Sequence, residues 1–244
     1  MSKNIKVSGF AQDIYAQSSS QKEAELDTVR ALYDGRMFAY ARAGATALAA
    51  GVATTSSAPD ANVMTRTLSA NGGAAIGATE FKLTTGGAIT ADFYKDGYVW
   101  ASNEAGEGHL YRVKGHAAGT TDTVIYLKDP LRVAFVASTT VVSMFANRQS
   151  GIIIAANNTT AVAAPAGIPP IAVTEYYYFW NQVKGPAVYL ASGTQVLGDP
   201  VAALTSAGAL GPMSSSAIIT PWGIVLSKNA STEYGLITLA IPGY

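Results

Sequence analysis

The chain has 244 residues, and 13% of them are Asp, Glu, Lys or Arg, whereas an ordinary soluble domain carries roughly 25%. Its formal net charge is zero, so it has no long-range field to gather nucleic acid. Cysteine is absent, which excludes disulfides, thiolate metal sites and cysteine nucleophiles. The part of the surface without charged residues must consist of Ser, Thr, Asn and Gly, or it must be covered by another protein. This composition predicts a subunit of an assembly, with no nucleic-acid partner.

The N-terminal segment, residues 1–28, mixes polar residues with the isolated apolar residues Phe10, Ile14 and Tyr15. No apolar stretch follows its first basic residues, so we expect no secretory signal and synthesis in a cytoplasm. A helix confined to residues 21–27 would be marginal alone. Two interpretations stay open for this segment: an extended arm that orders against a neighbouring subunit, or a frayed terminus.

An Asp34-Gly35 pair lies between two alternating segments within residues 28–40. This predicts a β-hairpin with a type I′ turn, because both central residues of that turn need positive φ. The alanine-rich run 43–51 is short and flanked by glycines, which favours a loop and the start of a strand over a helix. The most apolar window, 41–53, is shorter than the roughly 20 residues that cross a bilayer, so no membrane partner is expected.

Residues 29–146 are predicted to form a β domain. Short segments rich in β-branched and aromatic residues recur there, separated by turn residues. The candidate strands lie at 80–83, 97–101, 109–113, 123–127, 132–135 and 139–145, with a hairpin loop at 103–108. Strands of this length and spacing predict a sandwich or a barrel.

Residues 147–172 are rich in Pro and Ala and contain consecutive prolines, which cannot donate to a strand ladder, so they predict a linker or a long loop. Residues 173–244 are β again and complete either the same domain or a second one. Strands are predicted at 176–180, 186–190 and 234–241, with turns at Gly193, Gly198, Gly208, Gly211 and Gly223. The expected fold is all-β, a β-barrel or β-sandwich of one domain or two β subdomains, with an extended N-terminal arm.

Residues that could carry catalysis are few and scattered. His109 and His116 are seven apart, with no Cys or dense carboxylate group beside them, so a zinc site is not expected. A Ser-His-Asp triad built on His116 lacks a Gly-x-Ser-x-Gly context, and the glycine-rich run 71–77 lacks the Lys-Ser/Thr of a phosphate loop. Glu104 and Glu107 fit a solvated hairpin tip. The sequence predicts no catalytic residue, no metal, no cofactor and no enzyme activity.

Five successive aromatic residues at 176–180 form the most ambiguous feature. On a strand their rings must project from both faces. One face can belong to the core, and the other must then lie against a second protein layer, a partner subunit or a sugar ring. The candidate interface residues are Tyr176, Tyr178 and Trp180, together with Phe10, Ile14 and Tyr15.

Two segments, residues 34–51 and 178–187, resemble segments of virion structural proteins of tailed bacteriophages, some of which decorate or cement the outside of the head. The shared features are structural: the Asp-Gly hairpin, the aromatic strand and the Gly185-Pro186 corner. The resemblance implies a non-enzymatic capsid decoration protein that joins the virion in the host cytoplasm. Its implied partners are copies of itself, as a homo-oligomer, and the major capsid protein.

Two rival functions are kept open. One is a tail, neck or fibre component of the same particle that uses its aromatic residues on a carbohydrate or receptor. The other is an enzyme such as a depolymerase, which would need a carboxylate pair or a triad that the sequence does not display.

Overall fold

The computed structural model of this chain describes residues 5–8, 12–21, 24–156, 163–203, 208–213, 220–227 and 229–244. Strands hold 44% of the residues and helix holds 1%, which confirms the predicted all-β class. Within the described ranges, helical structure is confined to a 3₁₀ turn, η1 (Gln12–Tyr15). No helix of this part of the chain is long and apolar enough to span a membrane.

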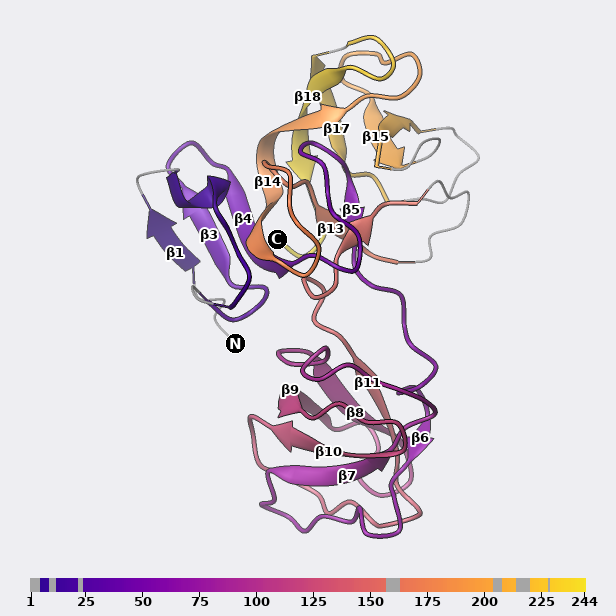
Figure 1. The fold of residues 1–244 in the computed structure, drawn as a ribbon. Coiled ribbons are helices and arrows are strands. Elements are labelled where there is room, and N and C mark those ends of the chain that lie inside the picture. The colour runs from indigo at the N-terminus through magenta and orange to yellow at the C-terminus, as the bar shows by residue number, and fades with distance from the viewer. Residues whose placement is uncertain are drawn as a thin grey trace. The chain divides into compact units, whose positions relative to one another are not determined.

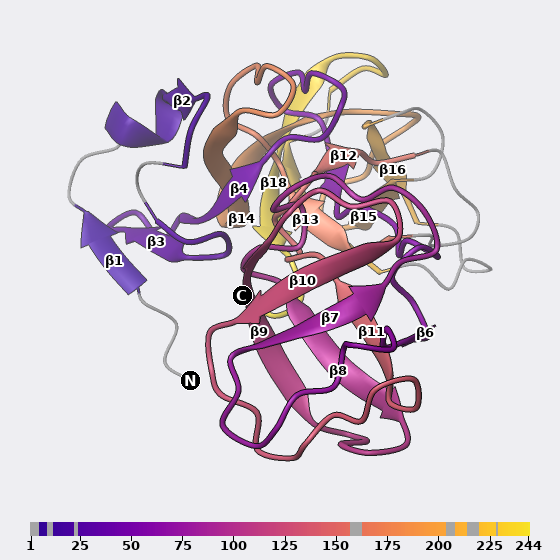
Figure 2. The same ribbon diagram turned by 60° about the horizontal axis from the view of Figure 1, so that its bottom comes forward.

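The chain divides into two compact units (Figures 1 and 2). The split unit consists of Met1–Ser57 and Arg148–Tyr244, and the inserted unit consists of Ala58–Asn147. This division differs from the predicted β domain at 29–146. The reason is long-range pairing: residues 29–42 form strands that join the C-terminal half of the chain in one sheet.

The split unit is built on a sheet of nine strands. Their order in space is β1, β3, β4, β14, β18, β17, β15, β16, and β2 also pairs with β14. β1 runs parallel to β3, and the other pairs are antiparallel. The bounds are β1 (Ile5–Ser8), β2 (Gln17–Ser18), β3 (Val29–Leu32), β4 (Met37–Arg42), β14 (Tyr178–Leu190), β15 (Pro200–Ala203), β16 (Leu210–Pro212), β17 (Gly223–Ser227) and β18 (Tyr234–Ala240).

β14 is one strand of 13 residues where the sequence predicts two. Gly185 adopts φ +87°, and a Cβ at this position would lie 2.9 Å from the Arg36 Cα, so the glycine admits both the local bend and the close approach of the β3–β4 hairpin. Pro186 lies beyond Lys184, where pairing with β4 ends. Its missing N–H therefore removes no ladder bond. Gly211 and Gly223, predicted as turns, also lie inside strands.

The segment 147–172, predicted as a linker or a long loop, contains two short strands in its described part. β5 (Thr54–Thr55) is the centre of a three-stranded sheet, flanked by β12 (Ile153–Ile154) and β13 (Pro165–Gly167). Pro165 opens β13, a position where a residue without an N–H is tolerated. The segment thus begins where the chain crosses from the inserted unit to the split unit, and its described part continues within the split unit.

The inserted unit is a six-stranded, nearly closed barrel. Its order is β6, β11, β8, β9, β10, β7, and a bridge between Leu68 and Leu83 brings the two ends of the sheet together. The bounds are β6 (Arg66–Thr67), β7 (Glu80–Thr84), β8 (Tyr98–Asn103), β9 (Leu110–His116), β10 (Asp122–Leu127) and β11 (Val141–Phe145). The predicted strand at 132–135 is absent. Phe135 instead makes an isolated bridge with Ala74 and packs its ring against Phe81.

The Asp34-Gly35 hairpin forms between β3 and β4, but its turn is not type I′. Gly35 has φ +85°, whereas Asp34 is not among the residues with positive φ. The Gly35 N–H donates to Leu32 O at 3.1 Å and the Leu32 N–H to Arg36 O at 2.8 Å. This is the pattern of a three-residue loop with Gly in the left-handed position. The Asp34 carboxylate accepts from the Arg36 N–H at 3.0 Å, which favours this alternative.

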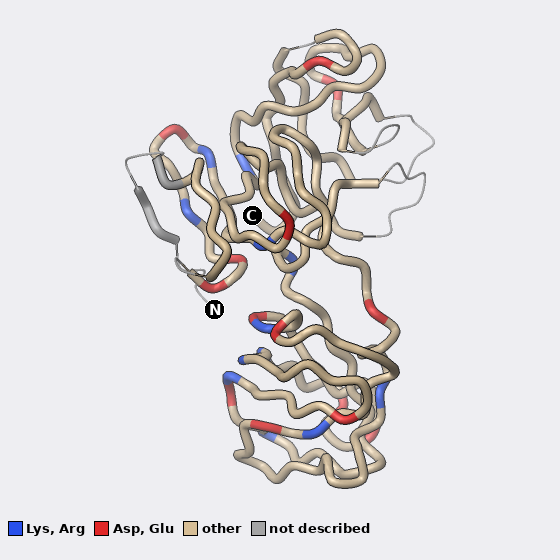
Figure 3. The backbone as a smooth tube through the Cα atoms, in the orientation of Figure 1, with Lys and Arg blue, Asp and Glu red and all other residues tan. Residues whose placement is uncertain are grey.

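Charge is distributed unevenly between the units (Figure 3). The inserted unit holds fifteen charged residues, eight of them acidic. The last sixty residues of the split unit, from Gly185 to Tyr244, hold three: Asp199, Lys228 and Glu233. All parts of the chain are poor in charge, and the last sixty residues are the poorest.

Candidate interaction surface

The predicted aromatic strand is covered on both faces by the chain itself. Phe179 and Trp180, on opposite faces of β14, are each 1% exposed. The Arg30 guanidinium lies over the Trp180 ring, 4.4 Å from its centroid. The Trp180 cluster consists of Ile14, Leu26, Leu32, Phe38, Tyr40 and Trp180. The second layer that the aromatic pattern demands is thus the chain's own N-terminal segment, and a sugar has no access to Trp180.

The other predicted interface residues differ in how far they are exposed. Tyr178 is half-buried against the Trp180 cluster. Tyr176 precedes β14, has φ +63° and is half-exposed, with the Arg42 guanidinium 5.8 Å from its ring centroid. Tyr15 is also half-exposed. Phe10 lies outside the described residues. Of the six candidates, Tyr15 and Tyr176 thus offer exposed rings, while Ile14 and Trp180 belong to the core.

The outer face of the sheet continues past the Trp180 cluster, where much of it is exposed and described residues border it at one end. Even-numbered residues of β14 and β18 share this face, and they meet in register: Pro186 opposite Thr238, Val188 opposite Leu236, and Leu190 opposite Tyr234. β17 and β15 extend it through Ile224 and Leu226, each about half-exposed, and through Pro200. We call Pro186, Val188, Pro200, Ile224, Leu226, Tyr234 and Leu236 the apolar face.

A groove of about 690 Å³ is hollowed into one end of the apolar face. Its apolar walls are Ile168, Pro169, Pro170, Pro186, Val188 and Leu236, with Tyr15 and Tyr234 beside them. Gly51 lies under the Tyr234 ring, where a Cβ would come within 2.7 Å of a ring carbon. The groove contains two strongly polar side chains, Arg36 and Gln182. Its volume lies in the range of ligand-binding clefts, and its lining is mostly apolar.

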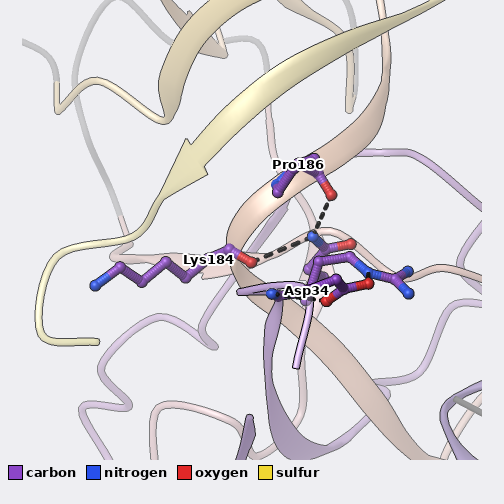
Figure 4. Close-up of polar contacts among 5 residues, drawn as sticks. Asp34, Lys184 and Pro186 are labelled. Carbon is purple, nitrogen blue, oxygen red and sulfur yellow. Dashed lines mark hydrogen bonds and ion pairs between the residues drawn. The ribbon is translucent and has the colours of Figure 1, made fainter. Parts of the chain in front are cut away.

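The backbone edge of β14 along the groove is mostly capped. The Gln182 Nε2 donates to Lys184 O at 3.2 Å and to Pro186 O at 2.7 Å (Figure 4). The Leu190 N–H donates to Gly51 O at 2.9 Å. Since Pro186 has no N–H, Val188 is the one position on this edge, among the described residues, whose backbone N–H and C=O have no partner. A whole strand cannot add to such an edge, so recognition falls to side chains.

The charge at the groove is locally balanced. Arg36 Nε lies 2.7 Å from Asp34 Oδ2, and both residues belong to the β3–β4 hairpin (Figure 4). Slight burial acts to raise the pKa of the Asp34 carboxyl, but the hydrogen bonds from Arg36 outweigh it and hold that pKa below its usual range. Burial acts to lower the pKa of Arg36, and the Tyr15 hydroxyl and Asp34 more than offset it. The groove is therefore suited to a group without net charge.

The two histidines, which are the candidate residues for a zinc site or a triad, do not lie in a common site. His109 lies in the β8–β9 hairpin and contacts Gly106 O at 3.1 Å through Nδ1. His116 is buried: Nε2 accepts from the Tyr94 N–H at 3.2 Å and Nδ1 donates to Ala117 O at 2.9 Å. Burial lowers its pKa, so it is a neutral structural residue near neutral pH. Nowhere in the described ranges do three or more His, Asp or Glu gather in a way that could hold a metal ion.

The apolar face was not predicted from the sequence. A signal was present, because residues 234–241 carry apolar side chains in both phases of a strand, with Leu236 and Tyr234 on one side and Ile237 and Leu239 on the other. A strand that is apolar in both phases indicates two faces to be covered. Comparisons with protein-family models, curated proteins and solved structures find no match for this chain.

Proposed function

We propose that this chain is a non-enzymatic structural protein of a phage virion, a head decoration or cement protein that binds copies of itself and the major capsid protein. The observation that best supports this role is the apolar face, which lies in the part of the chain with the fewest charges. Contiguous exposed apolar surface in a soluble protein commonly marks an interaction site. Such contact needs no chemistry, since burial contributes about 25 cal/mol per Å² before association costs.

The division into two units supports the same role. The split unit supplies an apolar face for contact, and the inserted unit carries a charged exterior that suits exposure to water. In a shell, many copies bind neighbouring sites at once, so weak individual contacts add up through avidity.

The test is binding to empty heads assembled from the major capsid protein of the same genome. We expect saturable co-sedimentation and a higher temperature of shell disruption when the chain is bound. Leu236→Lys should weaken binding by roughly tenfold or more, since it places a charge on the apolar face. The matched control is Leu110→Lys, at a 60% exposed leucine of the inserted unit, which should bind normally. Absence of binding by the unaltered chain across the micromolar range would refute the proposal.

The alternative, a tail, neck or fibre component that binds carbohydrate, loses Trp180 as its contact residue and retains Tyr176. This ring is half-exposed beside the Arg42 guanidinium, an arrangement that can hold a sugar ring. Glycan binding that Tyr176→Ala abolishes, together with no affinity for heads, would favour this alternative.

A further inference from the structure

We infer that His116 is a pH-sensitive latch in the inserted unit: its neutral imidazole holds the segment 90–95 in place, and protonation of the ring releases that segment. This inference goes beyond the proposed function, because it concerns how the inserted unit responds to acid and not what the chain binds.

A β-bulge in β9 turns His116 towards the interior of the barrel. The register between β9 and β10 shifts there, so that Leu127 lies opposite Val113 while Ile125 lies opposite His116. Residues directly opposite each other on neighbouring strands share one face of the sheet, and Ile125 is a fully buried member of the barrel core. The bulge thereby directs the imidazole inwards, where the residue is 3% exposed.

The segment 90–95 is attached to His116 by three hydrogen bonds. The Asp92 N–H donates to His116 O at 3.0 Å, and the His116 N–H donates to Asp92 Oδ1 at 3.0 Å. The Tyr94 N–H donates to His116 Nε2 at 3.2 Å, and the two rings lie 5.5 Å apart between centroids. Gly115 admits this close approach, since a Cβ there would lie 2.7 Å from Asp92 Oδ1. His116 therefore anchors the middle of the segment.

These hydrogen bonds require the ring to be neutral. The contact between Nδ1 and Ala117 O, at 2.9 Å, places a proton on Nδ1, because a carbonyl oxygen can only accept. Nε2 then accepts from the Tyr94 N–H as an unprotonated nitrogen. A proton on Nε2 would set a donor against a donor, so protonation and the Tyr94 contact exclude each other.

The surroundings of the ring oppose its protonation while the segment is closed. Burial lowers the pKa of His116, and the opposing effects of the carbonyl bound to Nδ1 and of the Asp92 carboxylate are smaller. The Asp60 carboxylate accepts from the Tyr94 hydroxyl at 3.0 Å. Lys95, also on the segment, is a cation and gives an imidazolium no stabilisation. Once the segment opens, water reaches the ring and its pKa returns towards 6.5, so acid favours the open state.

The segment can open without loss of the barrel around it, because both of its ends are held independently of the ring. The Ile89 N–H donates to Gly119 O at 2.8 Å, and the Asp96 N–H donates to Val113 O at 3.0 Å. Between these points Asp92 has φ +55°, a left-handed conformation that is unfavourable for a residue other than glycine and that surrounding contacts must maintain. Loss of the His116 contacts therefore frees the segment locally.

The experiment is hydrogen exchange read by mass spectrometry on the full chain from about pH 7.5 to about pH 4.5, with rates corrected for the intrinsic effect of pH. Below about pH 6.5, protection of the segment 90–95 should fall by up to tenfold per pH unit, while β10 and β11 keep theirs. His116→Gln offers an amide oxygen to the Tyr94 N–H and gains no proton, so its protection should not depend on pH. His109→Gln is the matched control and should retain the dependence.

A second measurement serves if His116→Gln does not fold. The His109→Gln chain has His116 as its single histidine, so its ring resonances are assigned directly by NMR, and their titration should coincide with the loss of protection. Tyr94→Phe removes the hydroxyl bound to Asp60 and keeps the N–H bound to His116, so it should open more at every pH with the same slope.

Three outcomes would overturn the inference. They are protection of the segment 90–95 that does not change with pH, an equal slope in a folded His116→Gln chain, and loss of protection in β10 and β11 together with the segment. The last would mean that acid unfolds the whole unit. None of them bears on head binding, which tests the proposed function separately.

Discussion

The two units differ in the kind of residue that they expose to water. In the inserted unit the strands β7 to β10 alternate buried and accessible positions along a nearly closed barrel, and charged residues such as Glu80 and Lys114 occupy exposed ones. In the split unit the outer face of β14 is covered over Trp180 and open over Val188. The chain thus combines a unit whose exterior carries charged residues with a second unit that exposes an apolar face. The exposed apolar face lies in the part of the chain with the fewest charged residues.

The largest expected effect on stability is that of Trp180→Ala. The side chain is 1% exposed at the centre of the Trp180 cluster, so its removal leaves a large cavity and should cost the split unit about 3–5 kcal/mol. Hydrogen exchange read by mass spectrometry, combined with denaturant, resolves the two units. Tyr176→Ala, on a half-exposed ring of the same segment, should cost less than about 0.5 kcal/mol. Equal loss of protection in the inserted unit would mean that the units do not unfold separately.

The next effect tests the inserted unit. Lys128 Nζ lies 2.7 Å from the Asp96 carboxylate, whose side chain is 1% exposed, so Lys128→Met removes a cationic partner from a buried charge and should cost about 3 kcal/mol. The matched control is Lys82→Met. Its partner Asp122 is 3.4 Å away and both side chains are more than one-third exposed, so the loss should be below about 1 kcal/mol. Urea denaturation measures both, and equal losses would contradict the assigned role of burial.

Much of the inserted unit could be predicted from the sequence, because its strands alternate and local turns join them. The segment at 80–83 predicts β7 nearly residue for residue. The predicted strand at 132–135 failed because Phe135 contributes to the core through its ring without a ladder around it. A local sequence pattern therefore finds the strands, but it also selects extended segments that contribute one side chain to the core and form no ladder.

The split unit was harder to predict because its structure depends on distant contacts. Gly185-Pro186 looks like a corner, and it continues a strand only because β4 ends its pairing at Lys184. The aromatic pattern correctly demanded a second layer over Trp180, but no local signal identifies Ile14, 166 positions earlier, as part of it. For the same reason the uncovered apolar face at Val188 could not be told from the covered part of the same strand.

A smaller effect concerns pH and the inserted unit. The pKa of His116 is lowered by burial from its ordinary value of 6.5, so below about pH 6.5 the unfolded chain takes up a proton that the folded chain does not. Stability should be fully present above that pH and fall as the pH drops towards the lowered value, by at most about 1.4 kcal/mol per pH unit. Thermal unfolding between pH 7.5 and 5.5 measures the slope. His116→Gln should reduce this dependence of stability on pH. An unchanged slope in the variant would mean that another group takes up the proton.

The smallest effect on stability is the sharpest test of the comparison. Ile224→Lys replaces a half-exposed residue of the apolar face and should change the free energy of unfolding by less than about 0.5 kcal/mol. It should nevertheless lower concentration-dependent light scattering, because it places a charge on a face that otherwise offers apolar area to other molecules. Leu110→Lys makes a similar chemical change on the inserted unit and should leave scattering unchanged, since that position lies outside the apolar face. If both substitutions lower scattering equally, exposed apolar area in general drives association, and the split unit has no special role in it.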